Sequence, residues 1–368
     1  MNFDFSPEQK AFGAQIRRLL ERQYSLAQAR AALGGDAGMS HAIWSALGEA
    51  GFLGAAIDCE HGGVGLGPLE ICVAAQELGR ALAPTPSLAS VYLCAEAIRL
   101  YGDKAQRAHW LPLLASGAAT GAWASDDSFA PVLSELPVLD AGRLRGERPL
   151  VLNGLMGDVV VTLARTLGDE TVLALCPLNG SGIQRSAAPG IDPTRRAASL
   201  RFDNAPAQPL GHAGASAYLR LVERAAIFLA FEQIGAADRG LEMARDYALQ
   251  RKSFGRPIGS YQAIKHKLAD IYAGNQIARA HAYYGAWAVA VDAGELPLAA
   301  AGARVSACEA LTASAQENIQ THGGIGVTWD SDCHLFYRRA RCDALVLGGP
   351  LAWKSRALDI LRASAGSE

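Results

Sequence analysis

The stretch RKSFGRPIGSYQ, residues 251–262, interrupts the most regular part of the chain. On both sides of it, apolar residues recur every three or four positions over long segments, the spacing of an amphipathic helix. Basic residues in a last turn suit the helix dipole, and glycine and proline end helices. These rules predict two long helices with a tight connection. They do not explain why three basic residues gather beside Phe254.

The overall composition is that of an ordinary globular protein. The chain has 368 residues, of which 50% are hydrophobic and 19% charged, and its formal net charge is −2. This length allows two or three domains of roughly 100–200 residues each. A nearly neutral charge argues against a surface for nucleic acid or for anionic membranes.

Cysteine usage and hydropathy limit the choice of compartment. The seven cysteines form no CxxC pair and no metal-ligand spacing with the eight histidines. We therefore expect reduced thiols, no metal site and a cytoplasmic protein. No apolar run approaches the ~18 residues of a membrane span, and the polar start MNFDFSPEQK is unlike a signal peptide.

The periodicity divides the chain into three predicted domains. Residues 1–118 predict a helical domain, whose first helix begins at the capping-box sequence Ser6-Pro7-Glu8-Gln9. Residues 119–212 contain short β-rich runs between turn residues, which predicts a small antiparallel barrel or sandwich. Residues 213–368 predict an antiparallel four-helix bundle. Its helices are expected near 214–252, 260–293, 296–321 and 330–346.

Four stretches, in this order along the chain, carry a resemblance to a known family. They are EHGGVGLGPLEICVAAQELGR (60–80), GERPLVLNGLMGDVVVTLART (146–166), YALQRKSFGRPIGSYQAIKHKLADIY (247–272) and IQTHGGIGVT (319–328). Together they resemble the motifs of the acyl-CoA dehydrogenases. The resemblance implies a mainly α fold with an N-terminal helical domain, a middle β domain and a C-terminal four-helix bundle.

The resemblance also implies a reaction. Family members use FAD to convert an acyl-CoA thioester into its trans-2-enoyl-CoA. A carboxylate removes the α-proton, the flavin takes the β-hydride, and an electron-transfer flavoprotein then accepts the electrons. The substrate class, however, is indicated by the resemblance and not by any pocket residue.

The resemblance assigns one set of residues to an FAD held mainly by a neighbouring subunit. These residues are Arg251, Ser253, Phe254, Gln262, Gln320, Gly323 and Gly324. In this interpretation Arg251 gives the pyrophosphate a charge-assisted fork and Ser253 gives it a hydroxyl. The alternative for Arg251 is a solvated helix C-terminus.

The half of the FAD site that a subunit builds for itself departs from the family pattern. Leu150 and Leu152 stand where the family places a Trp and a Thr against the flavin ring, and neither leucine can hydrogen-bond. Asp126 and Asp127 replace a glycine-rich turn, and their charges would repel a pyrophosphate.

The usual catalytic base is also missing. Leu347 stands at the family's glutamate position and cannot accept a proton. Some members place the glutamate on the first bundle helix, where Glu223 is the nearest candidate. The family position falls two residues later, about 200° around the helix. A surface carboxylate paired with Arg220 or Arg224 is therefore an alternative for Glu223, and Glu232 is a second candidate base.

Three interpretations stay open at this point. The pattern is similar to family members that assemble as heterotetramers of two subunit types in the degradation of steroid side chains and related polycyclic acyl-CoAs. The chain is then either an FAD-dependent acyl-CoA dehydrogenase subunit, in a homo- or heterotetramer, or a non-catalytic paralogue that completes a partner's FAD site. A flavin oxidase or monooxygenase on the same fold is the third.

Overall fold

The N-terminal part of the computed structural model is helical. The structure describes residues 4–31, 33, 39–124 and 129–365. The first helix has the predicted capping box, because the Gln9 backbone N–H donates to the Ser6 hydroxyl at 3.2 Å and the Ser6 N–H donates to the Gln9 side chain at 2.9 Å. The helices are α1 (Pro7–Gln23), α2 (Leu26–Ala31), α3 (His41–Glu49), α4 (Pro68–Ala81), the π-helical segment η3 (Leu88–Ala95), α5 (Glu96–Tyr101) and α6 (Lys104–Ser116).

The middle part forms one mixed sheet in the order β6-β7-β3-β1-β4-β5-β8, with β2 paired to β3 and β4. Most neighbours are antiparallel, as expected, but β1 and β2 run parallel to β4. The chain passes through β3 before β4, which gives the crossover that parallel neighbours require. The strands are β1 (Gly121–Ala124), β2 (Val138–Asp140), β3 (Arg143–Leu152), β4 (Val159–Arg165), β5 (Thr171–Pro177), β6 (Ile183–Ala188), β7 (Ala197–Pro206) and β8 (Gln208–Pro209).

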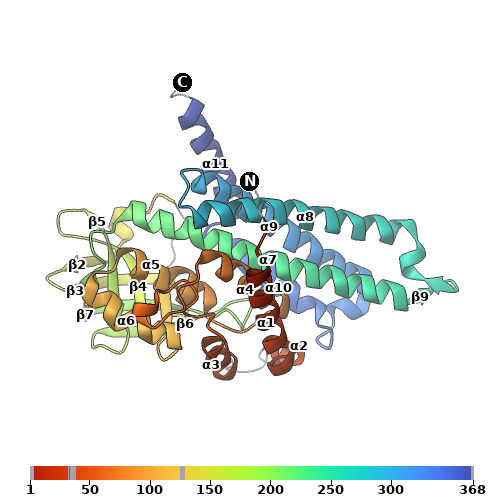
Figure 1. The fold of residues 1–368 in the computed structure, drawn as a ribbon, viewed down its shortest axis with the longest axis horizontal. Helices are drawn as coiled ribbons and strands as arrows, with labels where there is room; N and C mark the ends of the chain where they lie inside the picture. Colours follow the sequence, from red (N-terminus) through yellow and green to blue (C-terminus); the bar gives the residue numbers. More distant parts are fainter. Residues whose placement is uncertain (1–3, 32, 34–38, 125–128, 366–368) are drawn as a thin grey trace.

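The C-terminal part is a bundle of long helices. Three of them, α7, α8 and α9, lie side by side, with the β sheet at one end of α7 and a small hairpin at its other end (Figure 1). The helix α11, which the sequence analysis did not predict, leads away from the bundle to the C-terminus (Figure 1). The elements are α7 (Ala215–Gln250), the hairpin β9 (Lys252–Ser253) and β10 (Arg256–Pro257), α8 (Gln262–Ala290), α9 (Leu296–His322), the 3-10 segment η6 (Gly323–Val327), α10 (Cys333–Leu345) and α11 (Pro350–Ala365).

Two glycines hold the N-terminal helices against the bundle. A Cβ on Gly79 of α4 would overlap the carbonyl of Glu232 on α7, and a Cβ on Gly235 of α7 would overlap the carbonyl of Gln76. Only glycine permits this contact between two helix backbones. One apolar core then runs from α4 and η3 through α7 to strands β4 and β5. No helix in the described part of the chain is long and apolar enough to cross a bilayer.

Candidate functional site

A cavity of about 760 Å³ opens where the three parts of the chain meet. The middle sheet contributes Leu150 and Leu152 at the end of β3, and the bundle contributes Arg341 and Leu345 from α10. Residues of the segment that leads into η3 form a third wall. Most of this lining is apolar, so the cavity suits a small apolar ligand.

Among the described residues, the cavity offers no carboxylate or imidazole that could take a proton from a substrate. Its described lining contains no carboxylate and no histidine. Two of its polar side chains already have partners within the chain: the Asn153 amide donates to the Gly121 carbonyl at 3.0 Å, and the Thr194 hydroxyl donates to Asp192 at 2.6 Å. General-base catalysis needs a basic group within hydrogen-bond reach of the substrate, and the described lining has neither a carboxylate nor an imidazole for this role.

A buried charge cluster lies behind the cavity wall and centres on Arg195. This residue pairs with Glu232 of α7, and its Nε lies 3.1 Å from Asp343 Oδ1 of α10. The Tyr92 hydroxyl donates to Glu232 at 2.8 Å. Burial raises the pKa of the Asp343 carboxyl, and Arg195 opposes that shift. Glu232, the second candidate base, is thus part of an internal ion pair that joins all three parts of the chain.

Sequence reasoning missed Arg195. The adjacent cations Arg195 and Arg196 in the turn before β7 were the available signal. A second ion pair, between Arg339 Nε and Asp192 Oδ2 at 2.6 Å, lies beside the first and ties the same turn to α10. Both arginines are buried or nearly so, which is usual only for paired charges.

The prediction that Glu223 is a surface carboxylate paired with Arg220 or Arg224 is wrong. Its side chain is 3% exposed and pairs with Arg356 of α11, whereas the other two arginines pair with other carboxylates. The unpredicted helix α11 supplies this partner. Burial raises the pKa of Glu223 in spite of the arginine. Glu223 does not line the cavity.

Leu347 occupies the turn between α10 and α11. It is 2% exposed, and its carbonyl accepts a hydrogen bond from the Trp353 indole at 2.9 Å. Its neighbour Val346 lines the cavity. The position that the family resemblance assigns to the base is therefore next to the cavity, but it is filled by a buried aliphatic side chain.

The stretch RKSFGRPIGSYQ, residues 251–262, forms the hairpin after α7 and lies at the surface of the protein. Arg251 ends α7 with an extended backbone, and its carbonyl accepts a hydrogen bond from Ile258 N–H at 2.8 Å. At the tip, Phe254 has a φ of 50° and is 95% exposed. Its cationic neighbours Arg251 and Lys252 form no ion pair with any residue that the structure describes. Ser253 lies in β9, and Gln262 is exposed at the start of α8.

The end of α9 lies beside the end of α7. The rings of Tyr247 and His322 stack at 4.1 Å and join the two ends. Gln320 is exposed there, and a Cβ on Gly323 or on Gly324 would meet no atom within 4 Å. The structure thus brings both halves of the predicted FAD-contact set to one end of the bundle, with open space around the two glycines.

These two regions differ in how well they fit an FAD. The hairpin end offers unpaired cations, an exposed aromatic ring and open backbone, which suit a pyrophosphate and a nucleotide. The cavity offers the side chains of Leu150 and Leu152, which could not hydrogen-bond the edge of a flavin. The predicted effect of Asp126 and Asp127 falls on residues outside the described part of the chain.

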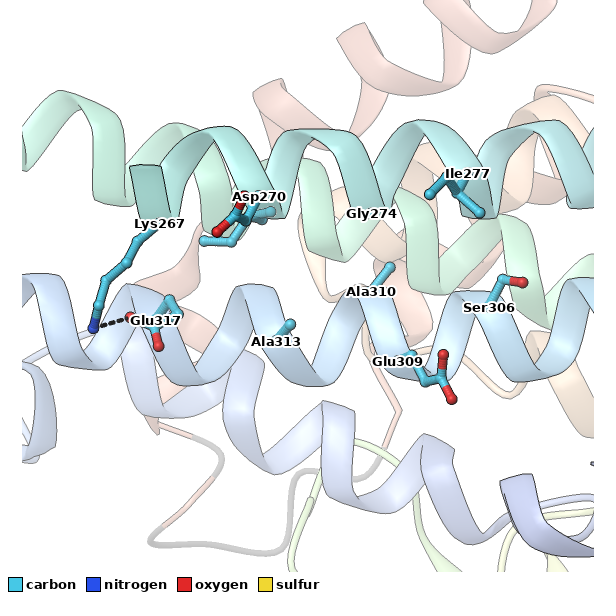
Figure 2. Close-up of a pocket in the computed structure, with 10 residues that line it drawn as sticks. Lys267, Asp270, Gly274, Ile277, Ser306, Glu309, Ala310, Ala313 and Glu317 are labelled. Carbon is cyan, nitrogen blue, oxygen red and sulfur yellow. Dashed lines mark hydrogen bonds and ion pairs between the residues drawn. The ribbon is translucent and has the colours of Figure 1, made fainter. Parts of the chain in front are cut away.

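A shallow groove of about 350 Å³ lies between α8 and α9. Lys267 of α8 reaches across it to Glu317 of α9, with 2.9 Å between Nζ and Oε2 (Figure 2). Farther along, the small residues Gly274 of α8 and Ala313 of α9 line the groove (Figure 2). Ile277 is 59% exposed there, and the charged residues Asp270 and Glu309 line the same groove, so its surface is mixed.

Comparison with known proteins gives consistent matches along the chain. Residues 6–118 match the acyl-CoA dehydrogenase N-terminal domain, and residues 212–350 match the C-terminal domain. The acyl-CoA dehydrogenase IpdE2 of Mycobacterium tuberculosis (strain ATCC 25618 / H37Rv) is 36% identical over 346 residues, which cover 93% of this chain and 94% of the relative.

Two solved structures are similar over almost the whole chain. The ChsE4-ChsE5 complex from Mycobacterium tuberculosis has a TM-score of 0.89 at 26% identity, covering 99% of both chains. A variant of the Tcur3481-Tcur3483 steroid ACAD has a TM-score of 0.88 at 27% identity, covering 98% of this chain and 99% of the other.

Proposed function

Because the chain belongs to the acyl-CoA dehydrogenase family, we propose that it is a subunit of an FAD-dependent acyl-CoA dehydrogenase whose catalytic base lies in a paralogous partner. The observation that carries this proposal is the described lining of the cavity, which has no carboxylate and no histidine. Glu223 cannot replace them there, since it pairs with Arg356 under α11.

The hairpin gives the chain its part in the assembled enzyme. Figure 1 shows the hairpin and the middle sheet at opposite ends of the bundle, so each region is placed to meet a different neighbour. The hairpin residues Arg251, Ser253 and Phe254, together with Gln320 and the glycines after it, contact the FAD of the partner. Bound there, FAD supplies the acceptor for the β-hydride, and this chain fixes its phosphates and closes its pocket.

Exposed apolar side chains on α8 support an oligomer. Tyr272 and Ile277 are each 59% exposed, and Ile277 lines the groove between α8 and α9. Their burial against other subunits agrees with the tetramer that we propose. The names of the two similar structures, a complex and a steroid ACAD, support a heteromer that acts on a bulky acyl-CoA. An electron-transfer flavoprotein is the proposed electron acceptor.

Co-expression with a paralogue that carries glutamate at the position of Leu347 tests this function. We expect the co-purified complex to contain FAD and to dehydrogenate an acyl-CoA, while this chain alone has no activity. Steady dehydrogenation by this chain in the absence of any partner would reject the proposal.

A further inference from the structure

We propose that α11 of this chain docks into the groove between α8 and α9 of a second copy, so that two copies join through a pair of equal contacts. The inference rests on the proposed function and deepens it, because it assigns the surface that joins two copies of this chain within the tetramer. It starts from a helix that leaves the bundle and from a groove that lies beside the start of that helix.

The first turns of α11 are fixed to the rest of the chain. Trp353 is fully buried, and Arg356 pairs with Glu223 of α7. Lys354 Nζ lies 2.8 Å from Glu309 Oε1 of α9. The buried contacts of Trp353 and Arg356 set the direction of the helix, which leaves the bundle on the side of α8 (Figure 1).

The rest of α11 has little cover within the described part of the chain. None of the residues 357–365 is buried, and Leu351, Leu358 and Leu361 are 82%, 53% and 50% exposed. Their spacing of seven and three residues places these leucines on one side of the helix, within about 80° of each other. A free helical end of this length is marginal in water, because most helical stability comes from packing of an apolar face. We therefore expect another surface to cover the leucines.

The groove between α8 and α9 has the shape that this side of a helix needs. The small residues Gly274 and Ala313 line it and leave room between the two helices, and Ile277 is 59% exposed beside them (Figure 2). An amphipathic helix that binds in a groove uses apolar residues three, four or seven positions apart as its anchors. The leucines of α11 have this spacing, so the groove can receive them.

The charges of the two surfaces are complementary. The described lining of the groove has more carboxylates than cations: Asp270, Glu309 and Glu317 against Lys267. Among them, Asp270 forms no ion pair with a described residue. On α11, Arg362 is 78% exposed, and its contact with Asp359 at 3.8 Å is too exposed to be strong. Arg362 follows Leu361 directly, so a docked α11 brings this cation to Asp270 of the other copy.

The position of the two surfaces favours a second copy as the occupant. Glu309 lines the groove and pairs with Lys354, so the groove and the start of α11 lie side by side on one face of the chain. A two-fold axis through this face places each α11 on the groove of the other copy, which is the self-complementary arrangement of a symmetric dimer. Two α11 helices paired only with each other would leave Asp270 and Ile277 without a partner.

Sedimentation equilibrium of the full-length chain tests the contact. We expect copies of the wild-type chain to associate. The double variant Leu358→Glu, Leu361→Glu should raise the Kd about a hundredfold or more, because each copy loses two apolar side chains from the contact. Leu167→Glu, at a leucine that is 71% exposed in the turn after β4, is the matched control and should leave the Kd unchanged. Circular dichroism reports whether each variant is folded.

A charge exchange tests which surface α11 meets. Arg362→Glu or Asp270→Arg alone should weaken association about tenfold, since each places like charges together at both contacts of the dimer. A chain with both substitutions should associate as the wild type does, because opposite charges face each other again. A wild-type chain that stays monomeric, an Asp270→Arg variant with unchanged association, or a double variant without recovery would overturn the proposal.

Flavin content and dehydrogenation in the complex with the paralogue test the proposed function separately. A complex that retains both, while the charge exchange has no effect on association, would refute only the contact between α11 and the groove. A complex without FAD, formed by a chain whose association follows the charge exchange, would refute only the proposed function.

Discussion

At the scale of single residues, Arg251 ends a helix with its backbone and, as we propose, binds a ligand with its side chain. Its backbone stops α7 and begins the hairpin through the Ile258 hydrogen bond, which any residue could make. Its guanidinium, in contrast, pairs with no described residue. Taken alone, this backbone hydrogen bond and the guanidinium without a described partner are also what a solvated helix C-terminus would show. The unpaired Lys252 and the 95% exposed Phe254 beside it are better explained by an anionic ligand from outside the chain.

We predict that Arg251→Ala lowers the flavin content of the assembled enzyme. The pyrophosphate loses a charge-assisted contact generally worth ~1.5–3 kcal/mol, which weakens FAD binding about tenfold or more. Absorbance of the purified complex measures it. Arg245→Ala is the matched control, since Arg245 lies one and a half turns earlier on α7 and pairs with Asp246 at 2.7 Å. Full flavin in the Arg251→Ala complex would contradict the assignment.

For Glu223→Gln we predict unchanged turnover in the assembled enzyme, since this carboxylate lies outside the cavity. Loss of a general base typically costs ~10²–10⁴-fold in rate, so a base at this position would be obvious. If the rate with an active acyl-CoA drops by that amount, the catalytic base is Glu223 of this chain and the prediction is wrong.

The Glu223→Gln substitution should also change how the free energy of unfolding depends on pH. Burial raises the folded pKa of Glu223 above its ordinary value of 4.5, so the folded state holds this proton more tightly than the unfolded state. The contribution of Glu223 to stability therefore falls as the pH rises from about 4.5 through the folded pKa. We expect the unfolding free energy of Glu223→Gln, relative to wild type, to increase over this interval. Denaturant titrations between pH 4 and 7.5 measure the difference, and a difference independent of pH would contradict it.

At the scale of elements, the sequence predicts the long helices well and the local exceptions poorly. The first bundle helix was expected near 214–252 and spans Ala215–Gln250, because apolar periodicity and the Gly/Pro connection agree there. The π-helical segment η3 lies inside the helical domain predicted for residues 1–118, since periodicity does not separate i→i+5 from i→i+4 bonding. The helix α11 has Leu351 82% exposed, and its apolar residues do not follow one buried face.

Because helix α11 was not predicted, its residue Arg356 was not identified as the partner of Glu223. Glu223 was assigned a neighbour on its own helix, because sequence spacing shows only contacts within an element. Its true partner, Arg356, is more than a hundred residues away and arrives on α11. The Arg195 cluster was missed for the same reason, since its members come from the middle sheet, α7 and α10. The proposed FAD-contact residues, by comparison, lie in two contiguous stretches that the sequence alone can indicate, and their contact with FAD stays a prediction.

The segment η6 gives a prediction that separates folding from cofactor contact. A Cβ on Gly324 meets no atom within 4 Å in this chain. We therefore expect Gly324→Val to leave the melting temperature of the isolated chain nearly unchanged but to lower flavin content in the complex, because the added side chain occupies the space of the nucleotide. Gly294→Val, at a glycine that also has open space around it, is the control. Normal flavin in the Gly324→Val complex would remove η6 from the proposed site.

At the scale of the whole molecule, exposed apolar surface and the two ends of the bundle point to the same arrangement. Tyr272 and Ile277 on α8 and Leu351 on α11 are large apolar residues with little cover in the isolated chain. We propose that other subunits cover these side chains in the assembled oligomer. The hairpin, whose cations Arg251 and Lys252 pair with no described residue, lies at the end of α7 away from the sheet (Figure 1), which agrees with the proposal that it contacts a neighbour's nucleotide.

This arrangement predicts how the chain behaves when it is purified alone. A homo-oligomer would have hairpins that can contact FAD, but the leucines of each cavity would offer the flavin no hydrogen bonds. We also expect that no subunit would supply a catalytic base. We therefore expect the chain alone to form an oligomer with well under one FAD per subunit, and to gain flavin when a paralogue with a complete middle domain is co-expressed. Light scattering together with absorbance at the flavin band measures both quantities. A stable homotetramer with about one FAD per chain would refute the heteromer, because it would show that Leu150 and Leu152 accept the ring after all.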